Sequence, residues 1–431
     1  MRRVAALLSA VLLCAVTSSG QEAMDSYGGW KRVRSVATQQ FRAVKSDGRW
    51  WFIDPDGNAF LSLGVNAVSL SPDATGSPEA GRYREAARRR YGNRQDWAVE
   101  AVRRLKAWGF NTVGVGSDGL VGRQGLPYTA TLDLTGGIEE KEGARGFPDV
   151  FSPAFVREAE ARARRTARAL ANDRLLVGYF TDDGRVWGAS AEALFACFLR
   201  LGDSAPGRVA LLKFLEDRYL QIEQLNETWG AEYGSFAEIG RVPQVGAAIP
   251  RADPDDFQRL VAEQYFTLAQ SAVRSVDRTH LLLGPRFSGL PPAPVLQAMR
   301  GHVNVVSLAS REDLPPAAAL REAYRLTQCP ILLSEFGGGL GQAKGREGGA
   351  ETQKERGQRY ARYLHEALAL PMVIGCHWQA YADPAEGADL GLVNLEDEPY
   401  QEFVASVTAA NQQAYTRHLG GESLRPPTSP R

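Results

Sequence analysis

The 431-residue sequence predicts an α/β fold, a closed (β/α)8 TIM barrel, and three observations carry this prediction. The chain contains eight short apolar runs, most of which end in Gly, Asp, Asn, Ser or Glu. Amphipathic patterns with helical periodicity lie between most of these runs. Strands that alternate with helices pair in parallel, and eight such units favour a closed barrel. The length is also sufficient for one barrel of about 250 residues with insertions.

The expected strands and helices can be placed along the chain in order. The eight apolar runs are Ala59 to Asn66, Asn111 to Gly116, Tyr128 to Leu132, Leu175 to Thr181, Leu281 to Pro285, Val303 to Leu308, Ile331 to Glu335 and Val373 to Gln379. The amphipathic segments are Trp97 to Trp108, Pro153 to Asn172, Asp256 to Val276, Ala317 to Leu326 and Glu351 to Leu370. A doubly wound open sheet is the rival fold, but the first run ends without the spaced glycines of a phosphate loop.

Two additions to the barrel are expected. Residues 49–60 predict an N-terminal β-hairpin that leads into the first strand, because Pro55-Asp56-Gly57 supplies turn geometry. The connection between the fourth and fifth strands, residues 187–256, is unusually long and predicts a helical insertion over the barrel mouth. We expect one catalytic-type domain over residues 40–415 and a disordered tail over 420–431, where prolines accumulate.

Charge and the N-terminal residues predict the compartment and exclude some partners. Lys+Arg and Asp+Glu are equal at 50 each, so no net field recruits nucleic acid or an anionic membrane. Residues 1–20 combine two arginines, an apolar run and a small-residue end, which is typical of a secretory signal peptide. We therefore expect a secreted or periplasmic protein that is not in the membrane in its mature form. A lipoprotein anchor at Cys14 is the minority alternative, because Leu13 is bulky where small residues usually precede such a cysteine.

The seventh apolar run ends in a lone carboxylate, Glu335, followed by Phe336 and Gly337. The C-terminal ends of the strands carry the catalytic groups in (β/α)8 enzymes. A buried run does not normally end in Glu without a partner, since an unpaired buried carboxylate is unfavourable. Glu335 is therefore a candidate catalytic residue, and a glutamate that forms a salt bridge at a strand end is the alternative.

The fourth apolar run breaks into a polar segment, Thr181 to Gly184, between aromatic residues. This pattern is typical of a parallel barrel strand that delivers a polar side chain to a ligand. In a regular strand the side chains of Asp182 and Asp183 point to opposite faces. Asp183 is thus a candidate acid/base or ligand contact, and Asp182 is a candidate ligand contact or a cap of the turn.

These segments resemble the retaining (β/α)8 glycosidases of clan A, most closely the β-agarase-like families. The fourth strand of those families ends in aromatic-Phe-x-Asp-Asn-Glu, whose Glu is the catalytic acid/base; here Asp183 occupies the Asn position and Gly184 the Glu position. The resemblance implies that Glu335 is the nucleophile, which attacks the anomeric carbon and forms a glycosyl-enzyme. Further matching motifs, in a consistent order along the barrel, extend the resemblance over most of residues 45–405.

The resemblance and the strand ends supply further candidates for substrate binding. In the last strand, Trp378 matches the tryptophan that forms the floor of the sugar site, with a buried core Trp as the alternative. His377 is expected to bond substrate or to be satisfied in the barrel wall. Arg286, at the end of the fifth strand, is expected to bond a sugar or to pair with an acid such as Glu335. Asn66 is a rim candidate, with loop capping as its alternative.

The sequence therefore predicts a secreted glycoside hydrolase, agarase-like by resemblance, that cleaves β-linked galactose-containing or related polysaccharides by double displacement. We expect no cofactor and no metal, because the five histidines lack metal-ligand spacing. The partner is a polysaccharide or oligosaccharide substrate. A carbohydrate-binding pseudoenzyme that has lost its general acid at Gly184 is the alternative. Because a general acid contributes roughly 10²–10⁴-fold, its loss would leave weak turnover if the nucleophile and binding site remain.

Overall fold

Eight parallel strands close a barrel in the computed structural model, which describes residues 24–71, 80–136, 147–184, 187, 190–243, 248–337 and 352–420. Around the barrel, the strands are β5 (Ser62–Val65), β6 (Thr112–Val113), β7 (Tyr128–Thr131), β8 (Leu176–Asp183), β9 (Leu281–Phe287), β10 (Val306–Ser310), β11 (Ile331–Phe336) and β12 (Val373–Trp378). β12 pairs in parallel with β5 and closes the ring. Each of the eight expected runs overlaps one of these strands, so the predicted (β/α)8 barrel is confirmed.

The predicted hairpin belongs to a larger N-terminal sheet. β1 (Trp30–Arg34), β2 (Arg42–Ser46), β3 (Arg49–Ile53) and β4 (Asn58–Phe60) form an antiparallel sheet in the order β1-β4-β3-β2. The run from Ala59 to Asn66, expected as one strand, is divided: β4 joins this sheet and β5 joins the barrel. Between them, the backbone N–H of Leu61 donates to the Tyr415 hydroxyl at 3.1 Å rather than to a neighbouring strand. This bond marks the point where the chain changes sheets.

The barrel interior toward the N-terminal ends of the strands is a closed apolar core. Side chains from four barrel strands (Val177, Phe180, Leu281, Leu283, Leu332 and Ile374) and Val305, just before β10, pack with Phe41, Phe52 and Phe60 of the N-terminal segment. All of these side chains are buried. The N-terminal sheet thus contributes two aromatic side chains to the barrel core, and the residue before β2 contributes a third. Polar side chains are left for the C-terminal ends of the strands.

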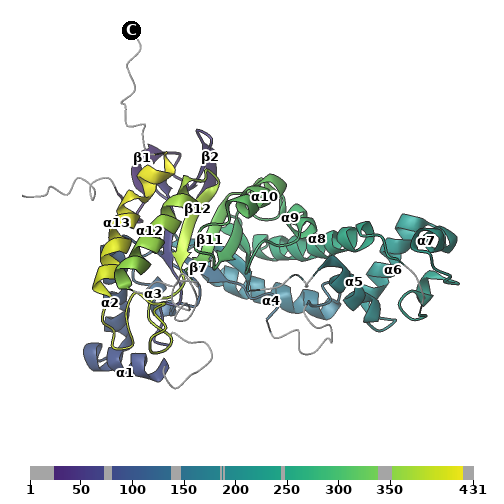
Figure 1. The fold of residues 1–431 in the computed structure, drawn as a ribbon, viewed down its shortest axis with the longest axis horizontal. Helices are drawn as coiled ribbons and strands as arrows, with labels where there is room; N and C mark the ends of the chain where they lie inside the picture. The colour runs from purple at the N-terminus through teal and green to yellow at the C-terminus, as the bar shows by residue number, and fades with distance from the viewer. Residues whose placement is uncertain are drawn as a thin grey trace, which may run out of the picture.

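Helices pack around the barrel, as Figure 1 shows. They are α2 (Arg94–Ala107), α4 (Pro153–Leu170), α8 (Ala252–Arg274), α9 (Ala293–Met299), α10 (Ala317–Thr327), α12 (Gln353–Ala369) and α13 (Gln401–His418). The five amphipathic segments correspond to α2, α4, α8, α10 and α12. After the second barrel strand the chain forms only the short α3 (Gly119–Gly122). No helix of the described residues is long and apolar enough to cross a membrane.

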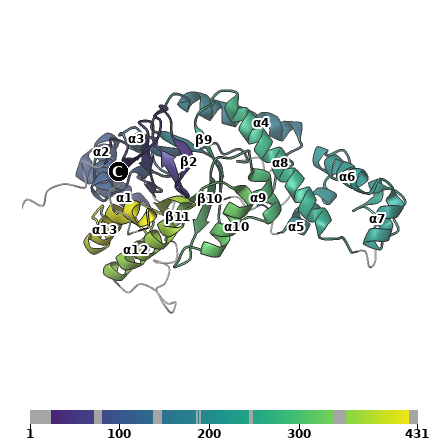
Figure 2. The same cartoon turned by 90° about the horizontal axis from the view of Figure 1, so that it is seen from above.

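The helical insertion after β8 is present, but its position differs from the expectation. It contains α5 (Ala191–Arg200), α6 (Pro206–Tyr219), α7 (Ile222–Trp229) and the 3-10 helix η1 (Phe236–Glu238). Figures 1 and 2 show α6 and α7 beside the barrel, at the far end of the long α8, and not over the mouth. The reason is that the insertion packs on α8: Tyr219 and the Trp229 indole both donate to the buried Asp253 carboxylate, at 2.7 and 2.8 Å.

The expected signal peptide, residues 1–20 with Cys14, lies outside the described residues, as does the expected tail beyond Gly420.

One buried carboxylate, Asp397, ties the rim of the barrel together. It accepts hydrogen bonds from Tyr83 and Tyr91 of α1 (Ala80–Tyr91), and it pairs with Arg104 of α2 at 3.1 Å. The Asp397 side chain is fully buried and that of Arg104 is 6% exposed. Asp397 therefore fastens α1, an extra helix in the first βα connection, to the segment that follows β12.

We predict that Asp397→Asn lowers the free energy of unfolding by about 3 kcal/mol, because it removes the charge that pairs with the buried Arg104. Asn tolerates the left-handed backbone of this residue (φ 60°), so the substitution tests the charge and not the turn. Urea unfolding measures the effect. Glu396→Gln is the matched control, because Glu396 forms only half-exposed ion pairs and should change stability by less than about 1 kcal/mol. Equal effects of the two variants would refute the role of Asp397.

Candidate active site

Three charged side chains meet at the C-terminal end of the barrel. Asp183 ends β8, Arg286 lies near the end of β9, and Glu335 lies near the end of β11. Asp183 and Arg286 are direct partners in the parallel register of β8 and β9. A positive φ of 67° at Gly284, which a glycine adopts readily, accompanies a shift of register two residues before Arg286. The barrel thus brings together the three residues that the sequence placed at separate strand ends.

Arg286 bridges the two carboxylates. Its Nη1 lies 2.5 Å from Asp183 Oδ1, and its Nη2 lies 2.8 Å from Glu335 Oε2. The Arg286 side chain is 6% exposed, whereas those of Glu335 and Asp183 are 21% and 47% exposed. A charge-assisted hydrogen bond of this kind is stronger than a neutral one and fixes geometry. The predicted pairing of Arg286 with Glu335 is therefore observed, and the same guanidinium also holds Asp183.

A second cation approaches the nucleophile candidate. Arg311 Nη2 lies 3.6 Å from Glu335 Oε1, and its side chain is 72% exposed. Arg311 was not among the candidates predicted from the sequence. It directly follows β10, so the rule that found the other candidates, a polar residue after an apolar run, also applies to it.

Gly184 leaves open space where the resemblance expects the acid/base. A Cβ built on Gly184 would have no heavy atom of the described residues within 4 Å. Its backbone N–H donates to the Arg286 carbonyl at 3.1 Å, and its φ is 67°, which disfavours a side chain. The glycine therefore does not relieve crowding by neighbouring side chains; it leaves the mouth without a carboxyl at this position.

Asp182 is a structural residue and not a sugar contact, contrary to one of its two expected roles. Its side chain is buried and accepts from the backbone N–H and the hydroxyl of Thr135, at 2.9 and 2.8 Å, and from the Tyr265 hydroxyl. Burial raises the pKa of this carboxyl to about 6. Asp182 caps the loop after β7 and joins it to α8, because it faces the opposite way from Asp183.

His377 lies below the charged residues as a neutral imidazole. Its Nε2 is 2.8 Å from Ser62 Oγ, and Ser62 in turn donates to Thr112. Because the Ser62 proton is used there, Nε2 carries the imidazole proton and Nδ1 is a lone pair without a hydrogen-bond partner among the described residues. Complete burial, with a smaller effect of the Arg286 charge, lowers the pKa of His377 to about 3. Of its two expected roles, the His377 imidazole has the one in the barrel wall, where it is bonded to Ser62.

Asn66 and Trp378 both serve the frame of the site. The Asn66 amide donates to the carbonyl of Ser334 at 2.9 Å, so it links the first strand to the residue before Glu335. Trp378 is fully buried, its indole N–H donates to the Leu390 carbonyl at 2.9 Å, and its ring packs on Phe336. The Trp378 ring is thus part of the core among the described residues, as the buried alternative expects.

The chain is similar to known β-agarases. It is 28% identical to β-agarase A of Vibrio sp. (strain JT0107) over 440 residues, covering 84% of this chain and 44% of that protein. It is 23% identical to β-agarase B of the same strain over 481 residues, covering 90% and 50%. The chain thus spans about half the length of these relatives. A solved exo-β-agarase structure matches with a TM-score of 0.81 at 24% identity, over 92% of this chain and 68% of that one. No protein-family model matches. These findings confirm the resemblance to β-agarases.

We predict that Arg286→Met lowers the free energy of unfolding by about 2 kcal/mol, because it leaves the carboxylates of Asp183 and Glu335 without their shared cation. Without the cation the two carboxylates repel each other, so the loss of stability should be larger at low salt than at high salt. Denaturant unfolding at the two salt concentrations measures it.

The double variant Arg286→Met/Asp183→Asn is the control, because it removes one of the two like charges. Its stability should depend on salt less than that of Arg286→Met does. An Arg286→Met variant with a wild-type salt dependence would show that the guanidinium does not separate the carboxylates.

Proposed function

We propose that the chain is a retaining glycoside hydrolase of agarase-like specificity, which cleaves β-linked galactose-containing polysaccharides with Glu335 as nucleophile. The observation that carries the proposal is the position of Glu335: it lies at the C-terminal end of the seventh strand of a barrel similar to β-agarases, and a buried guanidinium orients it. The partly exposed carboxylate can reach a substrate at the mouth.

In this mechanism the Glu335 carboxylate attacks the anomeric carbon and expels the leaving-group oxygen, which gives a covalent glycosyl-enzyme that water hydrolyses. Arg286 holds one carboxylate oxygen, Oε2, so the other, Oε1, is the atom that attacks. Arg311 lies on the solvent side of Oε1 and is free to move, since its side chain is mostly exposed. The departing oxygen needs a proton, and Gly184 cannot supply it.

Asp183 is the candidate donor of that proton. Its carboxyl is near the mouth and half exposed, but one of its oxygens is bonded to Arg286. It would therefore have to leave this contact, or use its second oxygen, to reach the leaving group. We expect turnover to depend strongly on how good the leaving group is.

A carbohydrate-binding protein without catalysis is the second candidate function. The open, left-handed Gly184 favours it, because the position of the acid/base holds no side chain. Measurements on activated and unactivated substrates separate the two functions.

If Gly184 is a simple loss of the acid and Asp183 does not replace it, Gly184→Glu should raise turnover of agarose-type oligosaccharides by about 10²-fold or more, and turnover of aryl β-galactosides with good leaving groups far less. Gly184→Ala is the matched control: it carries the same strain at a positive φ without a carboxyl, and should bring no gain. Glu335→Gln should abolish turnover of both substrate types. Initial rates on both substrates check these outcomes.

Two results would contradict hydrolysis by this site. One is full turnover by Glu335→Gln. The other is a wild-type chain and a Gly184→Glu variant that bind oligosaccharide but are equally inert on aryl glycosides, which would favour the binding function. If Asp183 is the acid, Asp183→Asn abolishes turnover of unactivated substrates only, and Gly184→Glu adds little.

We also propose that the protein is exported, on the sequence pattern of residues 1–20. N-terminal sequencing of protein from the native host should find a start near residue 21. Cytoplasmic protein that retains Met1 would refute the export.

A further inference from the structure

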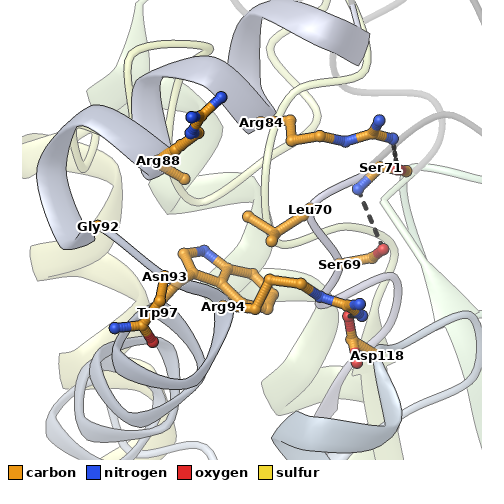
Figure 3. Close-up of a pocket in the computed structure, with 11 residues that line it drawn as sticks. Ser69, Leu70, Ser71, Arg84, Arg88, Gly92, Asn93, Arg94, Trp97 and Asp118 are labelled. Atoms are coloured by element: carbon orange, nitrogen blue, oxygen red, sulfur yellow. Dashed lines mark hydrogen bonds and ion pairs between the residues drawn. The ribbon is translucent and has the colours of Figure 1, made fainter.

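A pocket lies at the C-terminal end of the barrel, the end that carries Glu335, on the side of the first two strands (Figure 3). Its volume is about 480 Å³. Residues 69–71 follow β5, Asp118 follows β6, and the remaining wall comes from α1 and the start of α2. Because the C-terminal ends of all eight parallel strands share one end of the barrel, a bound polysaccharide could extend from Glu335 toward this pocket.

Two arginines of α1 line the pocket and form no ion pair with the described residues. Of the five arginines on this helix, Arg82, Arg89 and Arg90 pair with acidic residues of the segment 386–397. Arg84 and Arg88, one helical turn apart, line the pocket instead. Arg84 donates to the hydroxyl of Ser71, and neither arginine has a carboxylate partner among the described residues. The first group anchors the helix, and the second is available to a ligand.

Among the described lining residues, the carboxylate is Asp118, and its Oδ2 pairs with Arg94 Nη2 at 2.6 Å. Its other oxygen accepts from the backbone N–H of Leu120 at 3.0 Å. Asp118 and Arg94 lie side by side in Figure 3 and are satisfied by each other. Within the described part of the wall, the charges of Arg84 and Arg88 are therefore not neutralised.

The floor of the pocket is apolar. Trp97 and Ala87 lie beneath it, each 1% exposed, and Leu70 is partly exposed beside them. The indole N–H of Trp97 donates to the Tyr83 hydroxyl at 3.0 Å, so this floor adds no free donor. The groups of the pocket that reach solvent and carry charge are therefore the arginines of its wall.

We propose that this pocket binds an acidic sugar of the substrate chain, through a sulfate ester or carboxylate held by Arg84 and Arg88. Guanidinium groups bind such planar or tetrahedral oxyanions with paired hydrogen bonds, and the Ser71 hydroxyl adds a further donor or acceptor. The proposal rests on the proposed function, because it assigns a charged position on a glycan whose cleavage occurs at Glu335. It predicts a preference for anionic galactans over neutral ones.

The test measures binding in a Glu335→Gln background, so that cleavage does not interfere. Calorimetry compares three probes of equal length: a neutral agarose oligosaccharide, a sulfated galactan oligosaccharide and an oligogalacturonate. We expect at least one anionic probe to bind about tenfold or more tightly than the neutral one, and added salt to reduce this difference. The two anionic probes distinguish sulfate from carboxylate as the group bound.

Arg84→Gln/Arg88→Gln should remove the preference, so that the anionic probes bind no more tightly than the neutral one. Arg89→Gln is the matched control, since Arg89 is on the same helix but pairs with Glu396 outside the pocket, and it should keep the preference. Three results would overturn the proposal: equal binding of all probes, no binding of either anionic probe, or a preference that survives in the double variant. Hydrolysis of neutral substrate by the double variant with Glu335 intact reports separately on the proposed function.

Discussion

The arrangement of the mouth depends on one buried guanidinium. Arg286 pairs with Asp183 from the fourth barrel strand and with Glu335 from the seventh, and it is the positive charge between two carboxylates that would otherwise repel each other. The same charge adds to the burial that keeps His377 neutral beneath it. One side chain thereby orients the nucleophile candidate and adds to the effect of burial on the imidazole beneath it.

Much of this could be predicted from the sequence, because strand ends in a parallel barrel are marked by apolar runs that stop at a polar residue. Glu335 and Arg286 were found in this way, and the structure places them in contact. The roles of Asp182 and Trp378 were harder to predict. β8 has two register irregularities between Tyr179 and Asp183, so strand alternation does not fix which carboxyl faces the mouth. Whether Trp378 is open or buried depends on Phe336 and Leu390, which are distant in the sequence.

The position of the insertion could not be predicted for a similar reason. Its length indicated helices, but its place is set by the buried Asp253 of α8, which accepts from both Tyr219 and Trp229. The rim helix α1 shows the same dependence on a remote carboxylate, Asp397. In both cases the hydrogen-bond acceptor lies far along the chain from the element that it positions. At the rim of the barrel, Asp397 holds α1 in place. Arg286 separately holds Asp183 and Glu335.

The central claim is that Glu335 is a competent nucleophile although position 184 offers no acid. Covalent trapping tests this most directly, because a 2-deoxy-2-fluoro-β-galactoside with a dinitrophenolate leaving group needs no acid to form the glycosyl-enzyme, and the fluorine slows its hydrolysis. Mass spectrometry of the intact chain and of its peptides reads the outcome. We expect one fluorosugar per chain, attached to Glu335. A label on another carboxylate, or an unlabelled chain after prolonged incubation, would contradict it.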